Sequence, residues 1–107
     1  MNEVVTKEQL SIALEQADII IVSGALALQL RVLANKEVAP LALPAPEQVH
    51  RMPLSEAANY AQKAGLNVRS AFNLVRYIGV ANVFQVLRHY TVTLRRADGT
   101  ELLLRRK

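Results

Sequence analysis

The stretch YAQKAGLNVRSAFNLVR occupies residues 60–76 and predicts two helices joined by a tight turn. Gly65 stands where the chain must turn, because glycine alone adopts a positive φ without strain. Ala61, four residues earlier, is small enough to let two helices cross closely. Asn67 is a favourable N-cap for a second helix, which we expect to end at Gly79. The stretch therefore predicts an αα corner.

The outward face of this second helix is expected to carry Arg and Asn side chains. Leu66, Ala71 and Leu74 take the positions that pack on the first helix. The residues left outside are Val68, Arg69, Phe72, Asn73 and Arg76. Arg and Asn side chains pair bidentately with guanine and adenine edges in the major groove of DNA. Residues 57–76 thus resemble the helix-turn-helix of bacterial and phage transcription regulators. The resemblance implies DNA binding, and an ordinary αα corner with a basic face is the alternative.

The N-terminus of the same helix offers a second kind of contact. Asn67 and Ser70 lie where backbone amides and hydroxyls can hold a phosphate. The chain departs from the regulator pattern at Ala71, where a β-branched residue is usual, and in exposing Phe72. With three residues of a C-terminal hairpin, the predicted nucleic-acid-binding set is Asn67, Arg69, Ser70, Asn73, Arg76, Arg95, Arg96 and Arg105.

A second resemblance uses the same region. It rests on Ala64-Gly65-Leu66, Arg69-Ser70, Leu74-Val75 and Gly79, followed by a basic hairpin. These residues are similar to the αL RNA-binding domain of ribosomal proteins and pseudouridine synthases. That family usually has Ser before Arg and an Asn-Gly strand turn close behind, whereas an extra helix intervenes here. RNA therefore ranks below DNA as the expected ligand.

The C-terminal residues predict a β-hairpin around Asp98-Gly99, with residues 90–96 and 100–106 as its strands. A two-residue turn would pair Leu94 with Leu103 on the core face. Leu102 and Leu104 would then point to the opposite face.

The hairpin is strongly basic, and this has two explanations. One is a wing whose cations contact DNA phosphates. The other is a set of solubilising charges that protect an exposed sheet edge. The residues concerned are Arg95, Arg96, Arg105, Arg106 and Lys107.

The first part of the chain, residues 1–38, is apolar and begins with a capping box between Thr6 and Gln9. Apolar residues then recur at alternating steps of four and three, which predicts one long helix to about Ala34. A competing prediction breaks this helix near Ala17 and makes residues 18–22 a short strand. Gly24 would then lie in a turn before a second helix. β-branching favours the strand, and the continuous seam favours the single helix.

A helix with so much apolar surface needs a cover, so we expect it to form a homodimer or to bind a protein partner. The alternative function is therefore a non-enzymatic interaction module, an inhibitor or an adaptor. The predicted interface residues are Leu14, Ile21, Leu28, Leu102 and Leu104.

These elements predict a single domain of mainly helical α+β class over residues 1–107. A Pro-rich linker over residues 39–53 separates the N-terminal helix from a basic, helix-turn-helix-like part, residues 54–107. That part holds helices over 56–64, 67–78 and 80–89 and then the hairpin. Residues 1–50 contain three Lys/Arg and six Asp/Glu, a net charge of −3, and residues 51–107 contain ten and three, a net charge of +7. This asymmetry favours a polyanion-binding module beside an assembly module.

Several functional classes find no support in the sequence. There is no cysteine, His50 and His89 lie far apart without acidic neighbours, and no nucleotide-binding or nucleophile motif occurs. We therefore expect no metal, no cofactor and no enzymatic activity. The longest apolar window falls short of a membrane span and no signal peptide is evident, so a soluble, cytoplasmic protein is expected.

Overall fold

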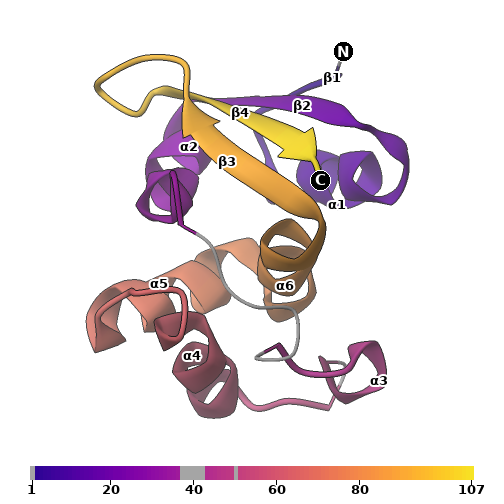
Figure 1. Cartoon of the computed structure of the whole chain (residues 1–107), viewed down its shortest axis with the longest axis vertical. Helices are drawn as coiled ribbons and strands as arrows, with labels where there is room; N and C mark the ends of the chain where they lie inside the picture. The colour runs from indigo at the N-terminus through magenta and orange to yellow at the C-terminus, as the bar shows by residue number, and fades with distance from the viewer. Residues whose placement is uncertain (1, 37–42, 50) are drawn as a thin grey trace.

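A computed structural model describes residues 2–36, 43–49 and 51–107 and has an α+β fold (Figure 1). Four strands form one sheet, and helices pack on it and on one another. In chain order the elements are β1 (Asn2–Val4), α1 (Lys7–Gln16), β2 (Ile19–Ser23), α2 (Ala25–Leu30), the 3-10 helix η1 (Arg31–Leu33), α3 (Pro46–Val49), α4 (Leu54–Gln62), α5 (Val68–Ile78), α6 (Val80–His89), β3 (Tyr90–Leu94) and β4 (Glu101–Arg106).

The prediction of one long N-terminal helix is wrong, and the competing prediction is confirmed. The Thr6–Gln9 capping box begins α1, which ends at Gln16. The β-branched run that follows forms β2, and Gly24, with φ 73°, turns the chain into α2. Ile20 and Val22 lie in the core and β2 pairs with β4. The apolar pattern of this segment fits a helix as well as a strand, and in the structure it forms a strand.

The sheet has the strand order β1-β2-β4-β3 (Figure 1). β1 and β2 are parallel, as their connection through α1 requires, and the other two pairs are antiparallel. The two central strands, β2 and β4, come from opposite ends of the described chain, and Ile20 pairs with Leu104. The predicted N-terminal and C-terminal parts therefore share one sheet.

The hairpin is confirmed, but its register differs from the prediction. Leu94 pairs with Leu102, not with Leu103. The Glu101 carbonyl accepts hydrogen bonds from the amides of both Arg95 and Arg96, so two residues lie opposite one and the register shifts by one. The Gly99 amide donates to the Arg96 carbonyl at 3.0 Å, which closes a turn around Ala97 and Asp98. Gly99 has φ 81° while Asp98 is not in the left-handed region, whereas a type I′ turn needs positive φ at both positions.

A shift of one residue exchanges the two faces of a strand. Leu102 and Leu104 are therefore fully buried in the core, contrary to the predicted orientation. Leu103 lies on the other face, and Leu94, at the end of β3, is exposed.

The predicted helices of the second half are confirmed as α4, α5 and α6. Asn67 caps α5, as predicted, and Gly79 separates α5 from α6. The N-cap of α4 is Pro53, not Ser55 as predicted. Within the predicted linker, residues 39–42 and 50 lie outside the described residues. Part of the rest packs on the core: α3 is helical, Leu43 is buried, and Val49 and Met52 are partly buried.

One apolar core joins the sheet to the helices. The inward residues of all four strands, such as Val4, Val22 and Val92, belong to the same cluster as the buried residues of α1, α2 and α4 to α6. Helices α1, α2 and α6 contact the sheet, while α4 and α5 lie farther from it and pack on α6 (Figure 1). None of the helices in the described ranges is long and apolar enough to cross a membrane.

Candidate nucleic-acid interface

Helices α4 and α5 meet closely because small residues lie at their contact. Ala57, Ala61 and Ala71 are fully buried, and Leu74 is 1% exposed. The turn between the helices uses Gly65 at φ 97°, a conformation that strains any residue with a side chain. The αα corner predicted from the sequence is therefore present, and it fixes which face of α5 points outward.

The outward face of α5 carries the predicted side chains. Arg69, Asn73 and Arg76 are all exposed, and we call these three residues the α5 polar face. The Arg76 guanidinium carbon lies 5.7 Å from the centroid of the Tyr77 ring, an arrangement that restricts the arginine without neutralising it. Three side chains that can bind base edges or phosphates thus lie along one exposed helix.

The N-terminus of α5 is more restricted than the sequence suggests. The Asn67 side-chain oxygen accepts a hydrogen bond from the Ser70 amide at 2.8 Å. That oxygen and that amide already have partners, so neither is available to a ligand. Amides in the first turn of a helix lack intrahelical acceptors, which leaves those of Val68 and Arg69 to face a phosphate.

The charged residues on the Gly65 side of this corner are positive, and Glu56 lies in the first turn of α4. Residues 57–97 contain six Lys or Arg residues and no Asp or Glu. Lys63 lies in the turn, with its ammonium 4.6 Å from the centroid of the Tyr60 ring. The side chain of Lys36 also lies near the turn: its Nζ is 3.7 Å from the position that a Cβ of residue 65 would take. Neither lysine is among the residues predicted from the sequence, although the position of Lys63 close to Gly65 already places it at the turn.

The hairpin arginines, Arg95 and Arg96, are not part of this surface. Both pair with Glu101, at 3.0 Å for Arg95 and 3.5 Å for Arg96. The hairpin belongs to the sheet, whereas α5 lies in the helical part below it, and α2 contacts both (Figure 1). The predicted residues of α5 and the hairpin arginines therefore form two separate groups.

Arg105 belongs to neither group. It lies in β4, where it pairs with Ile19 of β2 and Thr91 of β3. Its side chain is exposed on the sheet face opposite the core. The structure therefore separates the eight predicted residues by their elements, and the five from α5 and its cap stay together.

The predicted partner interface does not form one surface. Leu14 is 3% exposed inside the core, together with Leu102 and Leu104. Ile21 lies on the opposite sheet face, yet it is almost completely covered. Leu28 alone among the five is substantially exposed, at 42%. The predicted apolar stripe is wrong because it assumed a single helix where the chain forms a strand.

Comparison with protein-family models, with curated proteins and with solved structures found no match to this chain. In the part of the chain that the structure describes, no three His, Cys, Asp or Glu side chains gather where they could hold a metal ion. The function is therefore inferred from the geometry and charge of the chain's own surface.

Proposed function

We propose that this protein binds duplex DNA through α5, with the α5 polar face in the major groove. The observation that carries the proposal is an exposed helix with Arg69, Asn73 and Arg76 outward and no acidic residue from Ala57 to Ala97. The tight corner with α4 supports it, because that packing leaves one whole face of α5 free. A role as a transcription regulator is the most direct use of such binding.

Each element of the corner has a task in this proposal. Arg69 and Arg76 donate to guanine edges or to phosphates, and Asn73 pairs with adenine. Lys63, at the turn, contributes to phosphate binding and to the salt dependence of the affinity. Phe72, 37% exposed on the same helix, fits the methyl group of thymine.

Fluorescence anisotropy with labelled duplex DNA tests the proposal. The triple variant Arg69→Ala, Asn73→Ala and Arg76→Ala removes exposed side chains, so its fold should survive. We expect its DNA affinity to fall by about 1–3 kcal/mol for each good contact, with a flatter salt dependence where a phosphate contact is lost. Circular dichroism of the variant controls for folding. Equal binding by wild type and variant, or no binding by wild type at about 100 mM salt, would contradict the proposal.

The same measurement separates DNA from RNA. A hairpin RNA and a duplex DNA of equal length are titrated side by side. A-form RNA has a deep, narrow major groove that side chains cannot reach, so a helix used for base readout should prefer the DNA. A preference for the RNA would favour the αL-type alternative.

A protein–protein interaction module is the second candidate, and one observation favours it. Besides Phe72, α5 exposes Val68 and Tyr77, which are 66% and 51% accessible. Large apolar side chains on an exposed helix are typical of a helix that docks on a partner or on a second copy. Sedimentation velocity of wild type and of a Val68→Ser, Tyr77→Ser variant tests self-association. A wild-type dimer that the variant abolishes would support this candidate.

A further inference from the structure

A pocket of about 380 Å³ lies on the side of α6 that faces α1 and the C-terminal strand. Its volume falls in the range of small-molecule sites, about 300–1,000 Å³. It is separate from the α5 polar face and has no role in the proposed DNA binding. Its lining residues are Leu14 and Glu15 of α1, Val49 of α3, Ala81, Phe84, Gln85, Arg88 and His89 of α6, and Arg106 of β4.

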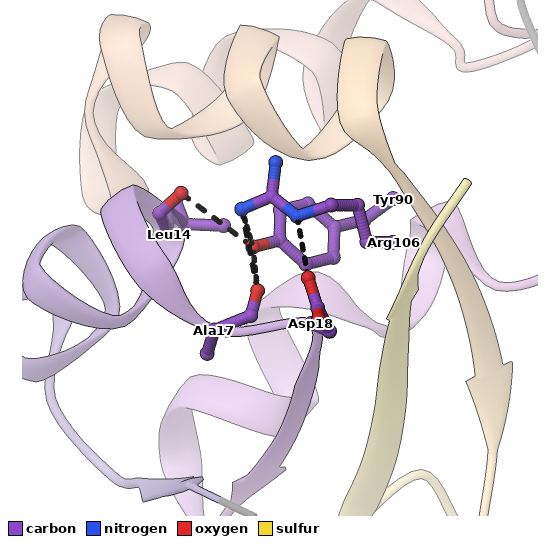
Figure 2. Close-up of polar contacts among 5 residues, drawn as sticks. All are labelled: Leu14, Ala17, Asp18, Tyr90 and Arg106. Carbon is purple, nitrogen blue, oxygen red and sulfur yellow. Dashed lines mark hydrogen bonds and ion pairs between the residues drawn. The ribbon is translucent and has the colours of Figure 1, made fainter.

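Arg106 is held in place at the edge of this pocket. Its Nε pairs with the Asp18 carboxylate at 3.2 Å, and its Nη2 donates to the Ala17 carbonyl at 3.3 Å and to the Tyr90 hydroxyl at 3.0 Å (Figure 2). The Tyr90 hydroxyl in turn donates to the Ala17 carbonyl at the end of α1. The other terminal nitrogen of Arg106 has no partner among the described residues and points toward α6 (Figure 2).

The remaining polar lining consists of Glu15 and Gln85 together with Arg88 and His89. Arg88 and His89 lie on the last turn of α6, and Arg88 also donates to the Pro44 carbonyl. Burial lowers the pKa of His89, and the nearby charges of Arg106, Arg88 and Lys107 lower it further. Two guanidinium groups and the Glu15 carboxylate therefore lie among the described lining residues, and the Asp18 carboxylate offsets part of the charge of Arg106.

The apolar lining residues are Leu14, Val49, Ala81 and Phe84. A site with a cationic end and an apolar wall selects a ligand with matching ends. An inorganic anion would leave the apolar wall unused, and a neutral apolar molecule would leave the guanidinium groups unpaired.

We propose that this pocket binds a small organic anion, a carboxylate or phosphate group attached to an apolar body of about one ring. The anionic group binds between Arg88 and the free nitrogen of Arg106, and the apolar body packs on Phe84 and Val49. Glu15 accepts a hydrogen bond from the ligand where the ligand carries a donor group. Where it carries none, the Glu15 carboxylate repels the anionic group and weakens binding.

Proton NMR of the imidazole of His89 in the full chain tests this site. The signal is assigned by its loss in His89→Gln. Phenyl phosphate and benzoate are the probes, with inorganic phosphate and benzyl alcohol as the anionic and apolar parts alone. We expect a saturable shift with a probe at concentrations where neither part alone produces one. Bound anion should also raise the pKa of His89, because it offsets the neighbouring positive charges.

Three variants define the location of the binding. Ala81→Leu places a larger side chain in the pocket and should reduce affinity at least tenfold. Ala25→Leu, at an exposed position of α2, is the control and should leave the affinity unchanged. Glu15→Gln should strengthen anion binding a few-fold, because it removes the opposing charge. Thermal denaturation controls for folding of each variant.

Three results would overturn the inference. One is the absence of a saturable shift with either probe at about 10 mM, which corresponds to less than about 3 kcal/mol of binding. Another is equal affinity for inorganic phosphate, which indicates non-specific attraction of anions. The third is undiminished binding in a folded Ala81→Leu variant. None of these results depends on whether the protein binds DNA.

Discussion

The chain has two basic regions, the α5 polar face and the hairpin arginines, and they differ in what surrounds them. Arg69 and Arg76 lie on an exposed helix in a stretch without acidic residues. Arg95 and Arg96 share one carboxylate, that of Glu101, at the end of the sheet. From the sequence alone the two regions are equal candidates for a polyanion-binding site. The structure distinguishes them by pairing.

The difference shows that the number of cations does not locate a binding site. A paired arginine must give up a partner before it can bind a phosphate, and an unpaired one need not. The hairpin also has a structural task, since the Arg31 guanidinium donates to the Asp98 carbonyl at 3.2 Å and the aliphatic part of Arg31 packs over Gly99. We therefore expect changes in α5 to affect binding and changes in the hairpin to affect stability.

The largest expected effect is on DNA affinity. The double variant Arg69→Ala, Arg76→Ala should lose about 2–6 kcal/mol of binding free energy, at about 1–3 kcal/mol for each contact. The matched variant Arg95→Ala, Arg96→Ala removes the same formal charge and should lose less than about 1 kcal/mol. Anisotropy titrations at one salt concentration measure both. Equal losses would remove the distinction between the two regions.

The next effect concerns the stability of the hairpin. Gly99→Val should lower the free energy of unfolding by about 1–3 kcal/mol, because a β-branched residue is strained at positive φ. The new Cβ would also come within 2.7 Å of the Arg31 Cδ. Ala97→Val, at an exposed position of the same turn, is the control. Urea denaturation checks the prediction, and identical midpoints for both variants would show that the turn is misassigned.

A smaller effect is expected where the hairpin joins α1. Tyr90→Phe removes the hydroxyl that donates to the Ala17 carbonyl and accepts from Arg106. A net hydrogen bond contributes about 1 kcal/mol, so a loss of that size is expected without a change in fold. Thr91→Val, on the opposite face of β3, serves as a comparison in the same thermal unfolding experiment. An unaffected Tyr90→Phe variant would show that this contact does not stabilise the native state.

The smallest effect is a pH dependence of the turn. Hydrogen bonds from the Thr100 hydroxyl and the Thr100 amide hold the pKa of Asp98 below its ordinary value. A lowered native-state pKa means that the ionised form stabilises the turn above about pH 4, and that this contribution is lost as the pH falls through the native pKa. Hydrogen exchange of the Thr100 amide should therefore accelerate in acid. Asp98→Asn keeps the acceptor and should remove the pH dependence.

Local signals predicted much of the fold. The N-cap at Asn67, the stop at Gly79 and the bounds of α6 all follow from residues within one helical turn of the boundary. The choice between helix and strand for residues 19–23 could not be predicted from local signals. The run Ile19-Ile20-Ile21-Val22 fits the apolar period of a helix and that of a strand, and its partner strand β4 lies about 80 positions away. The hairpin register failed for a related reason. Asp98-Gly99 predicts a two-residue turn, whereas in the structure the Glu101 carbonyl accepts from two successive amides and Arg31, remote in sequence, packs on Gly99.

The exposure of Arg69, Asn73 and Arg76 was predictable from the sequence, since helical spacing alone fixes which residues of α5 share a face. The separation of the hairpin from α5 was not predictable, because it depends on how two distant elements pack. The same holds for the pocket beside α6, whose lining comes from four elements.

The pairing of β2 with β4 has a consequence for synthesis of the chain. β2 leaves the ribosome about 80 residues before the strand that covers one of its edges has been made. Until then the segment Ile19–Ser23 has an unpaired edge rich in β-branched apolar residues, which can pair with another chain. Cells that make this protein must keep nascent molecules apart during that interval, so slower synthesis or stronger expression should increase aggregation without any change in native stability.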